Sequence, residues 1–162
     1  MIRSLAGFFA LSLAAAAADY VSPVGHDHVL KSNRQEEERR QAWIGHWTGE
    51  ASAEGGIYRW LVIRSADGTF YLHGRMYQGG VGVAERIEAG EWGLADGSYI
   101  TKTDSEWDGA KFIPIDPSQP NLWGIYRIVG EQKDELTYRH EGLDKTYVVK
   151  RVGEKYELPE KG

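Results

Sequence analysis

Hydrophobic and polar positions alternate in short segments along most of the chain after residue 45. The clearest segment is Thr69 to Tyr77, where Phe70, Leu72 and Met76 share one face. A period of two residues is that of a half-buried β-strand. The same pattern predicts about eight strands, at residues 43–50, 57–64, 69–77, 81–92, 98–103, 122–129, 136–140 and 146–152.

The connections between these segments carry turn residues. Asp67-Gly68 and Asp96-Gly97 are dipeptides that readily adopt the positive φ angles of tight hairpins. Gly90 predicts a bend within the strand at 81–92. Three prolines between residues 114 and 120 cannot lie inside a central strand. Short connections between sequential strands indicate an antiparallel meander.

A meander of eight strands can remove its exposed edges by closing on itself. A two-sheet sandwich is the alternative, but it needs long crossing connections, and only the proline-rich stretch is long enough. We therefore predict an all-β fold, a single antiparallel up-and-down β-barrel of about eight strands over residues 45–153. Residues 154–162 would form a C-terminal tail.

One segment before the barrel has the pattern of a helix. Residues 32–43 begin with Ser32 or Asn33 as a possible cap, place glutamates near the start and place Arg39 and Arg40 toward the end. This charge order suits the helix dipole. The segment is almost entirely polar, which favours a short lid or plug at the edge of the barrel. Residues 19–44 are thus predicted to be a flexible lead followed by this helix.

The first residues have the order of a secretory signal. Arg3 precedes an apolar run at residues 5–13, and small residues at 14–18 offer a cleavage site after Ala18. A membrane helix is the alternative, but it needs about 20 apolar residues, and Asp19 interrupts the run. We predict a signal peptide at 1–18 and a soluble, periplasmic or secreted mature protein.

Composition narrows the function classes. The formal net charge is −5, whereas a nucleic-acid-binding face would be basic. There is no cysteine, which excludes disulfides, thiol catalysis and thiolate metal sites. Aromatic residues are abundant, with 6 Trp, 9 Tyr and 4 Phe.

The start of the first strand, Trp43 to Glu50, follows a short helix and contains Gly45 and Trp47. It resembles the Gly-x-Trp start of lipocalin-like (calycin) barrels. The resemblance implies that Trp47 closes the bottom of the barrel and that Arg151, near the end of the last strand, packs over it. A guanidinium stacking on an indole face would be favourable in any fold.

The run Gly45-x-Trp47-x-Gly49, with residues 88–92 later in the chain, also looks like the nitrobindin branch of these barrels, which holds haem. The haem ligand of that branch is a histidine close to the C-terminus. No histidine follows His140 here, so we expect neither haem nor another cofactor.

One face of several strands collects residues suited to an apolar chamber with phenolic hydroxyl groups. Such walls are typical of small-molecule sites. The alternative is that these side chains simply fill the barrel as its core. The candidate ligand-binding residues are Tyr58, Trp60, Phe70, Leu72, Met76, Tyr126 and Tyr138.

Metal binding is not expected. The segment 26–28 (His-Asp-His) lies in the flexible lead, and tetrahedral sites need three or four ligands in a rigid frame. The other histidines, His46, His73 and His140, fall on different predicted strands.

Catalytic motifs are also missing from the sequence. It contains no Gly-x-Ser-x-Gly elbow, no His-Glu-x-x-His helix and no phosphate-binding glycine loop. The pairs Glu85 with Glu88 and Asp104 with Glu106 are carboxylates that could act as acid and base, but they fall on exposed-looking segments. We do not expect an enzyme.

Two functions therefore remain open. One is an exported binding protein that holds a small hydrophobic molecule in the barrel. The other is a periplasmic protein-interaction module, an inhibitor or envelope assembly factor, with a packed barrel and no ligand. Its contact patch would consist of exposed aromatic residues, which are favoured at interface cores, namely Tyr71, Tyr77, Trp107 and Trp123.

Overall fold

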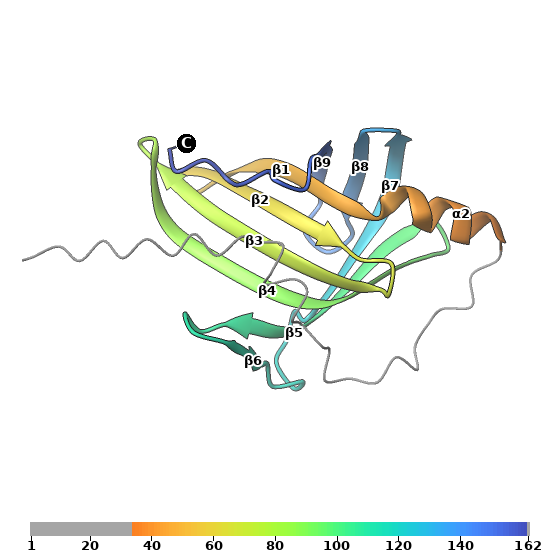
Figure 1. Ribbon diagram of the computed structural model, residues 1–162, viewed down its shortest axis with the longest axis horizontal. Helices are drawn as coiled ribbons and strands as arrows, with labels where there is room; N and C mark the ends of the chain where they lie inside the picture. Colours follow the sequence, from red (N-terminus) through yellow and green to blue (C-terminus); the bar gives the residue numbers. More distant parts are fainter. Residues whose placement is uncertain (1–33, 162) are drawn as a thin grey trace, which may run out of the picture.

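Eight strands pair in a closed ring in the computed structural model, which describes residues 34–161 (Figure 1). The elements in chain order are α2 (Arg34–Trp43), β1 (Gly45–Ala53), β2 (Gly56–Arg64), β3 (Thr69–Gln78), β4 (Val81–Ala95), β5 (Ser98–Trp107), β6 (Phe112–Pro114), β7 (Trp123–Gln132), β8 (Glu135–His140) and β9 (Lys145–Val152). Strand pairs are antiparallel throughout, and the ring closes where β9 pairs with β1. The predicted all-β, up-and-down barrel behind a short helix is confirmed, and the sandwich alternative is wrong.

The proline-rich stretch contributes one short strand outside the ring. β6 pairs only with the last residues of β5, opposite Ser105 to Trp107. Pro114 is the final residue of this edge strand, where a missing N–H does no harm. The prediction that these prolines cannot lie in a central strand is confirmed.

One of the two predicted Asp-Gly turns and the predicted bend have the expected geometry, whereas at Asp67-Gly68 only the glycine has a positive φ angle. Asp96 and Gly97 join β4 to β5 with φ angles of 50° and 75°, as a primed hairpin turn requires. The pairing of β4 with β5 shifts register between Ala89 and Gly90. A Cβ atom at Gly90 would lie 2.0 Å from the carbonyl oxygen of Lys102, so only glycine permits this close approach.

Helix α2 covers one end of the barrel, at the right in Figure 1. Arg39 pairs with Glu131 at 2.7 Å, and the Trp43 indole donates a hydrogen bond to the same carboxylate at 2.7 Å. Arg40 lies 5.0 Å from the ring centre of Trp92. The helix is thus tied to the barrel at the end that we call the closed end. The other end, where the β1–β2 hairpin lies, is the open end.

A second apolar cluster lies outside the barrel wall. This outer cluster consists of Leu61, Ile63, Tyr71 and Leu158. Leu158 belongs to the C-terminal segment, which runs back across the sheet toward the β3–β4 hairpin (Figure 1). The hydroxyl of Tyr77 donates to the carbonyl of Pro159 at 2.5 Å. The C-terminal segment therefore covers outward-facing aromatic residues of β3.

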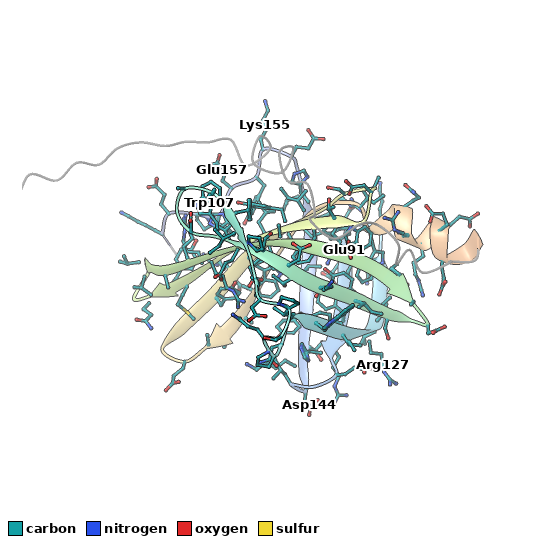
Figure 2. The ribbon with its side chains drawn as sticks, turned by 90° about the horizontal axis from the view of Figure 1, so that it is seen from below. Glu91, Trp107, Arg127, Asp144, Lys155 and Glu157 are labelled. Carbon is teal, nitrogen blue, oxygen red and sulfur yellow. The ribbon has the colours of Figure 1, made fainter. Side chains whose placement is uncertain are left out.

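The rest of the outer surface carries both charged and apolar side chains, and Trp123, Ile125 and Val129 of β7 are among the exposed apolar ones. Figure 2 shows Arg127, Asp144 and Lys155 projecting away from the barrel. Within residues 34–161, no helix is both long and apolar enough to span a membrane. The predicted signal peptide, the flexible lead and the first two residues of the predicted helix lie outside the described residues.

Candidate functional site

The closed end is built around two fully buried tryptophans, Trp43 at the end of α2 and Trp47 in β1. The Trp47 indole donates a hydrogen bond to the carbonyl of Trp43 at 2.9 Å. Arg151 is the register partner of Trp47 across β1 and β9, and its guanidinium carbon lies 4.1 Å from the indole centre. The structure thus brings together Trp47 and Arg151, the two residues that the calycin resemblance singled out.

Each of the three guanidinium nitrogens of Arg151 donates a hydrogen bond to a backbone carbonyl. Its Nη1 donates to the carbonyl of Ile44 at 2.9 Å, its Nη2 to that of Ala42 at 2.6 Å, and its Nε to that of Lys133 at 3.3 Å. Gly45 makes this possible, because its φ is +116° and a Cβ there would lie 3.0 Å from Nη1. The guanidinium therefore joins the last helical turn to the final hairpin.

A second arginine, Arg64, lies inside the closed end, and the sequence analysis missed it. Its exposed fraction is 1%. Its guanidinium carbon lies 4.5 Å from the ring centre of Tyr99, 5.0 Å from that of Trp43 and 5.9 Å from that of Trp47. None of its three nitrogens makes a hydrogen bond of ordinary length and angle. The signal was present, since the alternation Tyr58, Trp60, Val62 continues to residue 64.

An aromatic arc follows the inner wall from the closed end toward the open end. Its members, from β2 through β9, β8 and β7 to β5, are Tyr58, Trp60, Tyr147, Tyr138, Tyr126 and Tyr99. Successive ring centres lie 5.3–6.1 Å apart. These are the distances of favourable ring pairs. The arc therefore forms one continuous apolar surface with phenolic hydroxyl groups along it.

Three glycines let rings of the arc lie against the wall. A Cβ atom at Gly49 would lie 2.5 Å from the Trp60 ring, and one at Gly74 would lie 1.7 Å from the Tyr58 hydroxyl. At Gly124 it would lie 2.6 Å from the ring of Tyr126. Each ring thus occupies the space that a side chain on the wall would otherwise take.

All seven candidate ligand-binding residues share the inward face. Trp60, Phe70 and Tyr138 are buried in the interior cluster, and Tyr58, Leu72 and Tyr126 are half-buried and packed against it. Met76 is half-buried and stands opposite Tyr58 in register, nearer the open end. The sequence analysis did not include Tyr147, which shares the inward face of β9 with Val149 and Arg151.

Tyr126 and Tyr138 of the arc stay protonated at neutral pH. Burial raises the pKa of Tyr126, and the neighbouring phenols Tyr99 and Tyr138 raise it further. Burial also raises the pKa of Tyr138, although the positive charge of Arg64 beside it acts in the opposite direction. These hydroxyl groups can therefore donate hydrogen bonds to an acceptor inside the barrel.

The two carboxylate pairs do not lie on exposed segments as expected. Glu88 and Asp104 are each 7% exposed, whereas Glu85 and Glu106 lie at the surface. The expectation for Glu88 was wrong because it stands opposite Leu72 in register, and Leu72 is on the inward face. The Glu88 side chain therefore points into the barrel. The pKa of Glu88 is raised, because burial raises it more than the positive charge of its ion-pair partner Arg86 lowers it. The Arg86 pairing gives this carboxylate a structural partner.

The histidines do not converge. His46, His73 and His140 lie on β1, β3 and β8. His73 is buried and pairs through Nε2 with Glu85 at 2.6 Å. Among residues 34–161 there is no group of three or more side chains placed to hold a metal ion. The segment 26–28 lies outside the described residues.

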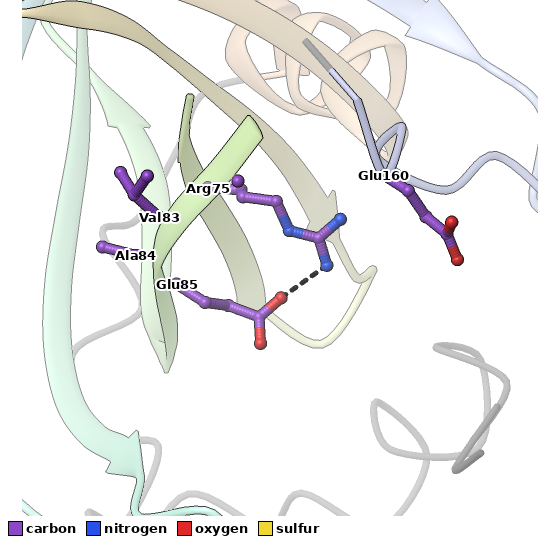
Figure 3. A pocket seen from close by; sticks show the side chains of 6 residues that line it. Arg75, Val83, Ala84, Glu85 and Glu160 are labelled. Carbon is purple, nitrogen blue, oxygen red and sulfur yellow. Dashed lines mark hydrogen bonds and ion pairs between the residues drawn. The ribbon is translucent and has the colours of Figure 1, made fainter. Parts of the chain in front are cut away.

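A surface hollow lies by the β3–β4 hairpin and the C-terminal segment (Figure 3). Two of its charged groups are engaged with each other, because Arg75 donates to Glu85 at 2.7 Å, and Arg75 also donates to the carbonyl of Pro159 at 3.1 Å. Burial raises the pKa of Glu85, but hydrogen bonds from Arg75 and His73 outweigh this and leave it lowered. The hollow anchors the C-terminal segment and offers a ligand few free groups.

The chain matches no protein-family model and no curated protein.

Proposed function

We propose that this domain binds a small hydrophobic molecule inside its barrel. The aromatic arc is the observation that carries the proposal. An eight-stranded barrel is wide enough for one small ligand, and apolar walls with a few placed polar groups are typical of such sites. The arc supplies both, with the indole of Trp60 beside the ring of Tyr58 and hydrogen-bonded to the hydroxyl group of Tyr138.

The closed end supports a lipocalin-like assignment of the barrel. A short helix, the Gly45-x-Trp47 start and an arginine on the last strand that stacks on Trp47 occur together. We propose that the protein is exported to the periplasm or secreted, on the strength of the signal-like residues 1–18. The ligand would be taken up there without haem or metal.

The contact patch expected for an interaction module is not formed. Tyr71 and Tyr77 are only 5% and 3% exposed, because the C-terminal segment covers them. Trp107 is half-buried against Phe112, with ring centres 5.4 Å apart. Only Trp123 is freely exposed. The four aromatic residues therefore do not support a shared partner surface, and we propose no second function.

Native mass spectrometry of the protein purified from its own export compartment tests the proposal. We expect a reproducible added mass that disappears on denaturation. An absorption spectrum of the same sample should show no haem band. A clean apo mass, together with no uptake from a lipid extract, would contradict ligand binding.

Substitutions then locate the ligand. Trp60→Ala and Tyr126→Ala should abolish uptake, because each removes a ring from the arc. Trp107→Ala is the matched control and should leave uptake intact, since that ring packs outside the barrel. Circular dichroism must show that the variants remain folded. Loss of uptake in Trp107→Ala alone would contradict an interior site.

A further inference from the structure

Arg64 is the most buried cation among the described residues, and no carboxylate there pairs with it. Its exposed fraction is 1%, Nε, Nη1 and Nη2 make no hydrogen bond of ordinary geometry, and the oxygen that lies beside the guanidinium is the neutral Tyr138 hydroxyl. Ring faces of Trp43, Trp47 and Tyr99 surround the charge. They stabilise it electrostatically, but an aromatic face offers the N–H groups no oxygen lone pair.

Such an arrangement is costly unless an anion completes it. A buried charge is normally paired and hydrogen-bonded, because removing it from water is expensive. No carboxylate of residues 34–161 forms an ion pair with Arg64, whereas the other buried charged side chain of the inner wall, Glu88, has Arg86. The pairing partner that Arg64 lacks is therefore expected from outside this part of the chain.

The site also adjoins the aromatic arc. Tyr99 contacts Arg64 and stacks on Tyr126, and Tyr138 lies beside Arg64 and contacts Tyr147. The cation thus stands at the closed end of a continuous apolar surface that leads toward the open end. A single charged group at one end of an apolar surface suits a molecule with one anionic head and an apolar tail.

We propose that Arg64 binds the carboxylate head of an apolar ligand, with the Tyr138 hydroxyl as a second donor. This inference rests on the proposed function and specifies its ligand as a hydrophobic carboxylate. The tail lies along the arc toward Tyr58. Arg64 lies six positions after Tyr58 on β2, about 20 Å along the strand and less along the tilted barrel axis. The tail that we propose is therefore an alkyl chain of medium length.

Binding of dodecanoate and dodecanol, followed by the fluorescence of the interior tryptophans, tests the head group. The two probes have the same chain and differ in charge. The wild-type protein is expected to bind dodecanoate at least about tenfold more tightly, since hydrogen bonds to charged groups are the stronger ones. Arg64→Met should abolish this preference and leave the dodecanol affinity unchanged. Arg127→Met, at an exposed position, should keep the preference.

The outcomes separate this inference from the proposed function. If wild-type protein binds neither probe, ligand binding itself fails and the inference fails with it. If dodecanol binds as tightly as dodecanoate, or if Arg64→Met keeps the preference, only the carboxylate assignment is overturned. Sodium acetate carries the head without the chain and should not raise Tm at millimolar concentration. An acetate shift as large as that of dodecanoate would overturn the amphiphile and assign the site to a small anion.

A measurement on the wild-type protein does not depend on how the variant folds. The Nε–H resonance of buried Arg64 should shift downfield when dodecanoate is added and stay unchanged with dodecanol. Arg64→Lys, which keeps the charge with fewer donors, should retain part of the preference. An Nε–H resonance unmoved by dodecanoate would overturn the proposal.

Discussion

Trp47 lies between two guanidinium groups that have opposite surroundings. Arg151 reaches its ring from the last strand, is partly exposed, and donates to the carbonyls of Ala42 and Ile44. Arg64 approaches it inside the barrel, is buried, and has only the neutral Tyr138 hydroxyl beside it, with no carboxylate of the described residues as a partner. The same side chain therefore serves two purposes within one end of the barrel. Arg151 holds parts of the fold together through its hydrogen bonds. Arg64 is left without an anionic partner among the described residues.

The comparison teaches that a guanidinium over a tryptophan does not by itself reveal its role. Aromatic contact is common to both arginines. What distinguishes them is the fate of their N–H donors. Donors satisfied by backbone carbonyls indicate closure, whereas buried donors without acceptors point to a ligand.

Removing the shared ring should have the largest effect. Trp47→Ala deletes a fully buried indole together with its hydrogen bond to Trp43. We expect a loss of about 3–5 kcal/mol in the free energy of unfolding, measured by urea denaturation. Trp123→Ala, at a ring that is 60% exposed, is the control and should change stability by less than about 0.5 kcal/mol. Equal losses of stability in both variants would contradict the central structural role that we assign to Trp47 at the closed end.

Replacing Arg151 should have the next largest effect. Arg151→Met leaves the carbonyls of Ala42 and Ile44 without their donor and loosens α2 from the last hairpin. The expected loss is about 1–3 kcal/mol in the free energy of unfolding, from the same urea experiment. Arg127→Met, whose side chain is 74% exposed, should be nearly neutral. A neutral Arg151→Met would mean that the two arginines differ less than their hydrogen bonds indicate.

Arg64 should respond in the opposite direction. Without ligand, Arg64→Met replaces an unpaired buried charge by an apolar chain of similar length, so stability should stay equal or rise by about 1 kcal/mol. Thermal unfolding of the ligand-free protein measures this. A clear drop in Tm would indicate that the three ring contacts alone make Arg64 a structural residue.

The outer cluster provides a comparison that neither arginine should influence. Burial, helped by the charge of Glu85, raises the pKa of Tyr71 to about 12. The folded state thus holds the Tyr71 proton more tightly than the unfolded state, whose pKa is near 10. The stability from this residue is complete below pH 10 and is lost as the pH rises from 10 to 12. Tyr71→Phe should flatten this decline and change little at neutral pH, as followed by urea denaturation across that range. If the free energy of unfolding of Tyr71→Phe fell with pH as steeply as that of the wild type, the C-terminal segment would not keep the Tyr71 hydroxyl from water.

Much of the barrel could be predicted because strand alternation is a local property. The period of two placed Phe70, Leu72 and Met76 on one face from their spacing alone, and that face is the inward one. The Asp96-Gly97 turn followed from residue chemistry. Both depend only on neighbours in sequence, and both agree with the structure.

The remaining features depend on contacts between distant residues. Tyr71 and Tyr77 alternate with the inward residues and so were expected to be exposed, but a segment some eighty residues later covers them. Arg64 was overlooked because an arginine at the end of a strand normally reaches water. Its burial follows from Trp43, which α2 folds over the end of the barrel. No local sequence pattern predicts that Trp43 covers Arg64 at the end of the barrel.

The three glycines behind the rings of the aromatic arc determine how much width the barrel interior has. At Gly49, Gly74 and Gly124 the wall recedes by one side chain, and a ring takes up the recess. A single methyl group at any of them would push its ring toward the barrel axis, narrowing the lumen from the wall inward. Substituting alanine at these three positions in turn would therefore make a graded series of apertures, in which the longest or bulkiest ligands are excluded first.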